Sequence, residues 1–177
     1  MKNSIEIIRD FIRSHNILPG DAIVVYKSGL KRAHHYVLVL ENYEFIQNST
    51  IKNINRPQID EVVAWLKDFI KVERFKGSIY ERRSVIQRAI DIEYEGRKYW
   101  LALYNCEHFV REAQTGAAYS KQVEKVAIAG SLGGAALAGY GIAKKNKALT
   151  IIGSIITGIS LGTMIYQSIT KPKYKYF

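Results

Sequence analysis

The stretch Asn105-Cys106-Glu107-His108-Phe109 holds the only cysteine of the 177-residue chain and opens a predicted helix over 107–122. Asparagine is a favoured N-cap residue, so Cys106 is expected in the first helical turn. The partial positive charge at a helix N-terminus lowers the pKa of a thiol and favours the nucleophilic thiolate. A lone thiol in this setting is a candidate nucleophile, and a buried structural cysteine is the alternative.

A predicted β-hairpin that turns at Glu41-Asn42 supplies a base for this thiol. If residues at equal distances from Glu41 face each other, His35 lies directly opposite Gln47 and the two side chains share one face of the sheet. His34 then points to the other face, and a one-residue slip of the register would nominate His34 instead. We therefore predict that His35 accepts the proton of Cys106 and that Gln47 orients the imidazole.

These residues also have structural interpretations. His35 in an apolar strand is equally a core histidine, and Gln47 at a strand end is often a surface residue. His108 is a second candidate base, but residues i and i+2 of a helix do not face each other, so we expect it to stabilise the helix start. The four histidines and one cysteine show no metal-ligand spacing, and no glycine-rich phosphate loop is present, so neither a metal nor a cofactor is expected.

The first 121 residues are predicted to form one α+β domain. Apolar residues recur at helical spacing near the N-terminus, Pro19-Gly20-Asp21 marks a turn, and residues 27–32 form a basic loop. The expected elements are helices over 3–14, 59–70, 81–91 and 107–122 and strands over 23–26, 36–40 and 43–47.

Residues 122–177 form a tail of different composition, with seven lysines and one glutamate that account for +6 of the net charge of +10. Eighteen uncharged residues rich in Gly and Ala lie between Lys125 and Lys144, and 23 uncharged residues rich in Ile lie between Lys147 and Lys171. A membrane-spanning helix needs about 20 apolar residues, so the second segment meets the length rule better than the first. A soluble helical hairpin packed on the domain is the alternative.

The tail is therefore expected to supply one or two membrane helices. Two spans would carry the lysine cluster at 144–147 to the far side of the membrane, against the positive-inside tendency, whereas a single span by the second segment would keep it on the domain side. Small residues four positions apart, Gly130 with Gly134 and Gly158 with Gly162, permit close helix packing and self-association through the tail.

Charge and compartment point to a lipid surface. The basic excess flanks apolar segments, which favours an anionic bilayer over nucleic acid as the partner, and no nucleic-acid-binding motif is present. The N-terminus has no secretory signal pattern, and a single cysteine suits a reducing compartment. We expect a membrane-anchored protein whose catalytic domain faces the cytoplasm.

Over roughly residues 17–120 the chain resembles the lecithin:retinol acyltransferase (LRAT) family. The NCEHF string of that family stands unbroken at 105–109 and is a specific motif. Three shorter matches are Pro19-Gly20-Asp21 before a strand, His35-Tyr36 as a His-aromatic pair, and Tyr99-Trp100-Leu101 before the cysteine motif.

The resemblance implies a circularly permuted papain-like fold, in which histidine precedes cysteine and an antiparallel sheet packs on helices. It also implies thiol acyl chemistry on glycerophospholipids, with Cys106 as nucleophile, His35 as base and Gln47 as the third polar residue. Two positions depart from the family pattern: Gln47 stands where many animal members have histidine, and Leu40-Glu41-Asn42 replaces a Gly-Asp-Gly-like turn.

The combined prediction is a membrane-anchored thiol acyltransferase or phospholipase A1/A2-type hydrolase that forms an acyl-thioester from glycerophospholipids. Backbone amides near the start of the cysteine helix are expected to stabilise the oxyanion. Two alternatives remain: a papain-like amidase or peptidase, and a membrane-remodelling or partner-binding protein with little catalysis.

Overall fold

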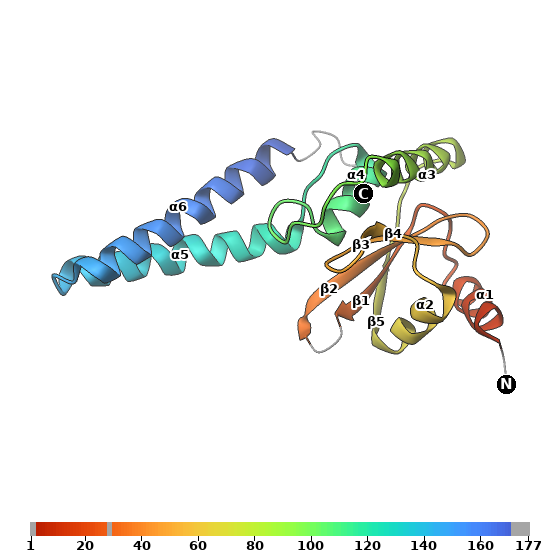
Figure 1. Ribbon diagram of the computed structural model, residues 1–177, viewed down its shortest axis with the longest axis horizontal. Coiled ribbons are helices and arrows are strands. Elements are labelled where there is room, and N and C mark those ends of the chain that lie inside the picture. The colour runs from red at the N-terminus through yellow and green to blue at the C-terminus, as the bar shows by residue number, and fades with distance from the viewer. Residues whose placement is uncertain (1–2, 28–29, 171–177) are drawn as a thin grey trace. The chain divides into compact units, whose positions relative to one another are not determined.

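The computed structural model describes residues 3–27 and 30–170. Their contacts divide the chain into two compact units, one built from the residues up to Ala118 and the other beginning at Tyr119 (Figure 1). The composition of the sequence places the boundary after residue 121.

The first unit contains a five-stranded sheet in the order β4-β3-β2-β1-β5, and every neighbouring pair is antiparallel. The strands are β1 (Ala22–Lys27), β2 (Leu30–Val39), β3 (Phe45–Ser49), β4 (Asn53–Asn55) and β5 (Phe69–Glu73). Alternate residues of β1 and β2 point to opposite faces, so each face carries its own apolar core.

Helices cover both faces of this sheet (Figure 1). One core joins the sheet to α1 (Ser4–Ser14) and α2 (Ile59–Trp65), and the other joins it to α3 (Ile79–Tyr94) and α4 (Cys106–Thr115). The predicted α+β class with an antiparallel sheet packed on helices is therefore confirmed.

The register of the β2–β3 hairpin differs from the prediction. The turn is centred on Asn42, one residue later than expected, because the Leu40 N–H donates to the Glu44 carbonyl at 2.9 Å and closes a three-residue turn. Val37, and not His35, consequently lies opposite Gln47. Since the shift is two residues, His35 and Gln47 still share a face.

Two predicted helices end earlier than expected. The helix predicted over 59–70 stops at Trp65, continues as a short 3-10 turn over Leu66–Asp68, and gives way to the edge strand β5 at Phe69. The helix predicted over 107–122 stops at Thr115, because Gly116 adopts a left-handed conformation with φ of 76°. A separate helix, α5, begins at Lys121 with Ser120 as its cap.

A fully buried carboxylate ties the first turn of the domain to the segment between β5 and α3. Asp21 Oδ1 accepts hydrogen bonds from the Arg82 guanidinium and the Phe75 N–H, both at 2.9 Å. Its Oδ2 accepts from the Arg74 guanidinium at 3.0 Å and from the Leu18 N–H at 3.1 Å. The aspartate of the Pro-Gly-Asp turn therefore has a structural role.

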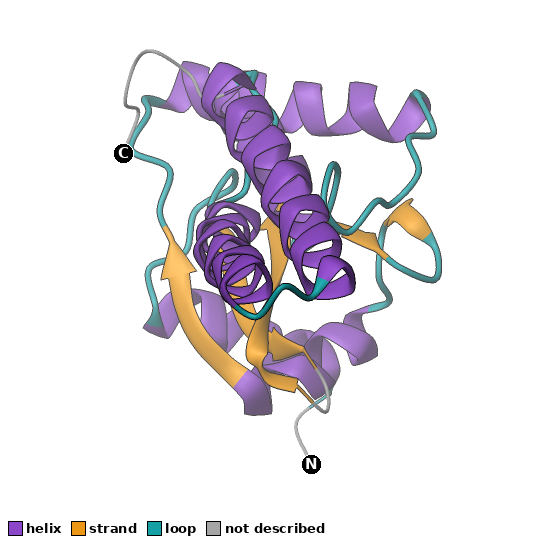
Figure 2. Cartoon of the chain, turned by 90° about the vertical axis from the view of Figure 1, so that its left-hand side faces the viewer, coloured by secondary structure: helices purple, strands orange, loops and turns teal. Residues whose placement is uncertain are grey.

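The second unit is a helical hairpin of α5 (Lys121–Ala143) and α6 (Lys147–Thr170), which lie side by side (Figure 2). Small residues allow this pairing. A Cβ added at Gly153 would lie 2.4 Å from the Ala138 backbone nitrogen, and one added at Gly134 would lie 2.8 Å from the Gly153 carbonyl oxygen. Gly158 and Gly162 face open space.

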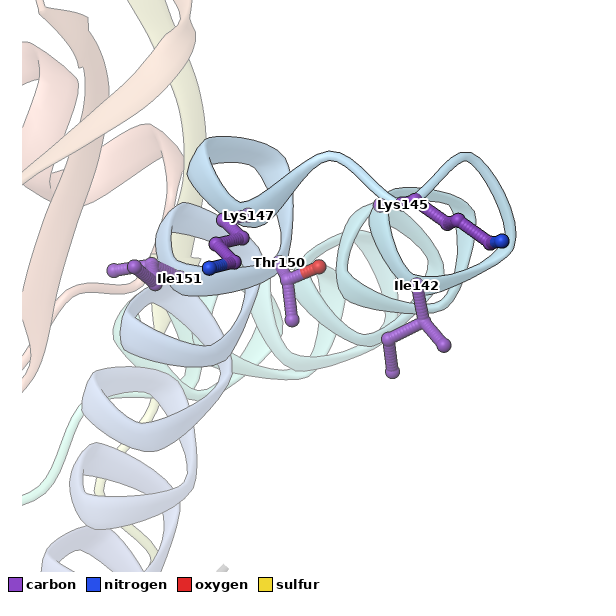
Figure 3. A pocket seen from close by; sticks show the side chains of 6 residues that line it. Ile142, Lys145, Lys147, Thr150 and Ile151 are labelled. Carbon is purple, nitrogen blue, oxygen red and sulfur yellow. The ribbon is translucent and has the colours of Figure 1, made fainter.

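Both hairpin helices are long and apolar enough to cross a membrane. Their outward surfaces carry large apolar side chains, whereas the contact between them is made by glycine and other small residues. The turn between the helices bears a shallow hollow lined by Ile142, Lys145, Lys147, Thr150 and Ile151 together with Gly141 (Figure 3). This hollow contains none of the predicted catalytic residues.

We expect Asp21→Asn to lower the free energy of unfolding by about 3 kcal/mol, since it leaves the buried Arg82 guanidinium without its charged partner. Chemical denaturation of the full chain in detergent, followed by tryptophan fluorescence, measures this change. Asp91→Asn is the control, because Asp91 is exposed on α3 and should change stability by no more than about 0.5 kcal/mol. Equal effects of the two variants would show that Asp21 is not central to the fold.

We expect Gly153→Leu to separate α5 from α6, because its side chain would collide with backbone atoms of α5. Gly158→Leu, on the same helix but facing open space, should leave the pairing intact. Spin labels at the exposed positions Leu132 and Ile159, in a cysteine-free background, report the separation by pulsed dipolar spectroscopy. An unchanged distance distribution in Gly153→Leu would contradict the close packing of the hairpin.

Candidate active site

The start of α4 is held by the residues of the Asn105–Phe109 stretch. The Asn105 side-chain oxygen accepts hydrogen bonds from the N–H groups of Glu107 and His108, at 2.9 and 3.1 Å. The His108 Nδ1 in turn accepts from the Asn105 N–H at 3.2 Å, which completes a capping box. His108 is fully buried and stabilises the helix start, as predicted.

Cys106 lies where strands β2 and β3 diverge. The ladder between these strands ends at the pair Val37–Gln47, which leaves the preceding residues of β2 open along that edge. The Asn48 amide, one residue beyond this pair, donates to the Tyr104 carbonyl at 3.0 Å and holds the segment that leads into α4. The N-terminus of α4 thereby fills the gap between the two strands.

The sulfur of Cys106 contacts the backbone of β2 on both sides of His35. The thiol lies 3.8 Å from the His34 carbonyl oxygen, to which it donates, and the Tyr36 N–H donates to the sulfur. Because these groups flank His35, the sulfur is level with that residue along the strand. Cys106 itself is a buried free cysteine.

His35 and Gln47 form a hydrogen-bonded pair. The His35 Nε2 lies 2.5 Å from the Gln47 Oε1. Since an amide oxygen only accepts, Nε2 carries the hydrogen and Nδ1 keeps a free lone pair in the neutral ring. Trp65 packs edge-on against the imidazole, with ring centroids 5.5 Å apart at 80°. The imidazole is therefore fixed both in its plane and in its tautomer.

The two cores show how these groups are divided. His35 pairs across the ladder with Val25, whose side chain belongs to the core under α1 and α2. Cys106 belongs to the opposite core, together with Tyr36. The sulfur therefore contacts the backbone edge of β2 from the core opposite the face that carries the His35 side chain. The His34 ring contacts Tyr26 instead, with centroids 5.9 Å apart.

Burial dominates the electrostatics of the pair. It raises the pKa of the Cys106 thiol to about 11, although the N–H groups of Tyr36 and Glu107 and the charge of Lys27 act in the opposite direction. Burial also lowers the pKa of His35, which the hydrogen bond to Gln47 raises and the charge of Lys27 lowers further. The helix start thus acts on the thiol pKa in the predicted direction, but burial outweighs it, so the net lowering that we expected is wrong and both thiol and imidazole are neutral in this state.

The sequence did not assign three residues near the pair to the site. Trp65 contacts His35, and Lys27 lies 6.0 Å from the centroid of the Tyr99 ring. Burial and the charge of Cys106 raise the pKa of Tyr99 to about 12, so that ring lies within electrostatic reach of the sulfur. Tyr99 lies outside every helix and strand predicted from the sequence. Its only indication of a role was the family match Tyr99-Trp100-Leu101.

Among the residues that the structure describes, no group of three metal-ligating side chains is found. The chemistry available at the gap between β2 and β3 is that of a thiol, an imidazole with a free Nδ1, and an amide that orients the ring. Such a set supports nucleophilic attack by sulfur with general-base assistance.

Comparison with known proteins agrees with this arrangement. Searches of curated proteins and of solved structures found no match. The family described as lecithin retinol acyltransferase matches residues 2–119, a range that includes every strand of the sheet and the cysteine helix. Because this match covers more than half of the chain, the protein belongs to the lecithin retinol acyltransferase family.

Proposed function

We propose that the protein is a membrane-anchored thiol acyltransferase or phospholipase of the A1/A2 type that acts on glycerophospholipids. The observation that carries this proposal is the position of the Cys106 sulfur against the backbone on both sides of His35, whose ring is oriented by Gln47. Family membership supports acyl transfer as the reaction class. The order of histidine before cysteine is compatible with a permuted papain-like fold.

The proposed reaction begins with proton transfer from the Cys106 thiol to Nδ1 of His35. The sulfur attacks the carbonyl carbon of a phospholipid ester, and the ester C–O bond breaks as the imidazolium returns its proton to the departing lyso-lipid oxygen. An acyl-thioester on Cys106 remains. Water, an amine or an alcohol then attacks the thioester, its proton passes to His35, and the sulfur leaves as the thiol.

A backbone amide at the helix start is the candidate oxyanion donor. The Asn105 side chain already binds the N–H groups of Glu107 and His108, and the Asn105 carbonyl accepts from Phe109. Within the described part of the chain, the N–H of Cys106 is the first-turn amide with no hydrogen bond in the structure. An amide beside the attacking sulfur is suited to a developing oxyanion.

The α5–α6 hairpin is the proposed anchor, with the first unit facing the cytoplasm. Its outward isoleucines and leucines suit a lipid environment, because contiguous apolar surface of this extent is rare on soluble proteins. Two paired helices favour two spans over one, which places the lysines at 144–147 in the far headgroup region. Gly158 and Gly162 leave one face of α6 open to self-association.

Incubation with phosphatidylcholine should add the mass of one acyl chain to wild-type protein, and peptide mass spectrometry should locate it on Cys106. Cys106→Ala should show no adduct and at least about a thousandfold lower turnover, since no nucleophile remains. Equal turnover by the two proteins, or a wild type that never acquires an acyl group, would refute the proposal.

The neutral resting pair has a measurable pH signature. Because the pKa of Cys106 is about 11, its alkylation by iodoacetamide should rise about tenfold per pH unit above neutrality, as the thiolate fraction grows. Turnover should fall at acid pH as His35 becomes protonated. Because burial lowers the pKa of His35, this fall should occur below pH 6.5, the ordinary pKa of histidine. Fast alkylation that is flat from about pH 6 to 8 would instead indicate a preformed thiolate–imidazolium pair.

A second candidate function is membrane remodelling by the hairpin with little catalysis. The raised pKa of the buried thiol is the observation that favours it. The full-length Cys106→Ala variant separates the two functions, because it keeps the hairpin and removes the nucleophile. An undiminished effect of this variant on membrane morphology would support remodelling.

A further inference from the structure

A loop directly before the cysteine helix exposes large apolar side chains. Trp100 is 62% exposed, Leu101 71% and Leu103 47%. Burial of each of these apolar side chains would normally stabilise the fold. Three exposed apolar side chains within four residues of one turn differ from a single scattered surface leucine. We call residues 100–103 the apolar loop.

Hydrogen bonds hold the apolar loop in a defined shape. The Trp100 N–H donates to the Tyr104 carbonyl at 3.0 Å, and the Tyr104 N–H returns a bond to the Trp100 carbonyl at 2.7 Å. The Leu103 N–H also donates to the Trp100 carbonyl, at 3.2 Å. The exposed side chains therefore project from a turn that backbone hydrogen bonds close.

The same loop is bonded to the cap of the cysteine helix. The Asn105 side-chain nitrogen donates to the Leu101 carbonyl at 3.0 Å, while its oxygen caps α4. One amide thus connects the apolar loop to the first turn of the helix that carries Cys106. A surface that receives the loop will lie next to the nucleophile.

The surroundings of the loop favour an anionic lipid surface as its partner. Lys98 is exposed two residues before Trp100, and Lys27 lies beside Tyr99. No ion pair in the described part of the chain involves either lysine. Tryptophan and leucine flanked by unpaired lysines are suited to the boundary between headgroups and acyl chains.

We propose that the apolar loop docks the catalytic unit onto the surface of a phospholipid bilayer, with Trp100, Leu101 and Leu103 inserted at the interface. This inference rests on the proposed function, since it assigns a route by which a bilayer lipid meets Cys106. Docking brings the ester of a bilayer lipid to the start of α4, where Cys106 lies, and a tether alone does not orient the catalytic unit in this way.

The direct test is tryptophan quenching in nanodiscs of phosphatidylcholine and phosphatidylserine. The chain has two tryptophans, so a Trp65→Phe background leaves Trp100 as the only fluorophore. Lipids brominated near the headgroup end of the acyl chain should quench Trp100 at least about twofold, as expected for an interfacial indole. Trp100 fluorescence that is no weaker in brominated than in unbrominated nanodiscs would overturn the proposal.

The kinetic test compares a bilayer lipid with a water-soluble monomeric ester. Trp100→Ser combined with Leu101→Ser should lower acylation of Cys106 by bilayer lipid about tenfold or more, because interfacial contact is lost. Acylation by the monomeric ester should fall by no more than about threefold, since no docking is needed. Ile51→Ser is the matched control, because Ile51 is 89% exposed in the turn between β3 and β4.

Each outcome has one interpretation. Equal losses on the two substrates would show that the loop supports the active site and not docking, and a dimer that dissociates in the loop variant would show that the loop binds a second copy. If wild type acquires no acyl group from either substrate but Trp100 is quenched, the proposed function fails and the docking surface stands.

Discussion

The structure depends on a buried helix start whose amide groups must be satisfied. The N-terminus of α4 enters the gap between β2 and β3, where its first N–H groups have no access to bulk water. Asn105 binds two of these groups, and His108 binds the Asn105 amide in return. The asparagine and the histidine of the cysteine motif are therefore required by hydrogen bonding, and Phe109 by the core beneath them.

This arrangement also explains why the thiol is neutral at rest. A helix N-terminus and two backbone amides favour the thiolate, but removal of a charge from water opposes them and is the larger effect. His35 is subject to the same effect in the other direction, because burial disfavours its cationic form. The pair is thus suited to proton transfer during attack, and water excluded by a bound lipid would strengthen the hydrogen bonds that assist it.

The sequence predicted those parts of the site that follow from local rules. The Asn105 cap, the structural role of His108 and the shared face of His35 and Gln47 all follow from helix-capping preferences and strand alternation. The register was wrong by two residues because a turn of Glu41-Asn42 and one closed by Leu40 and Glu44 cannot be distinguished by residue type. Because a shift of two residues keeps each side chain on the same face of the sheet, His35 and Gln47 still pair.

Other parts depend on contacts distant in the chain, and the sequence could not supply them. Phe69 and Ile70 continue the apolar pattern of α2, so only pairing with β1 makes them a strand. The contact of Trp65 with His35 and the position of Lys27 beside Tyr99 require the completed fold. The net shift of the thiol pKa was predicted in the wrong direction. The Asn105 cap indicated the helix start and its dipole, but the sequence did not indicate how deeply Cys106 is buried.

The open end of the α5–α6 hairpin has a consequence for biogenesis. The buried backbone N–H of Ser120, at the start of α5, donates to the side-chain oxygen of Gln167 near the end of α6, at 2.7 Å. Gln167 lies 47 residues after Ser120, so the partner of this amide is not yet present when only α5 has been synthesised. The bond at the open end of the hairpin therefore forms only once α6 has been made as far as Gln167, so this contact completes the two helices as a pair.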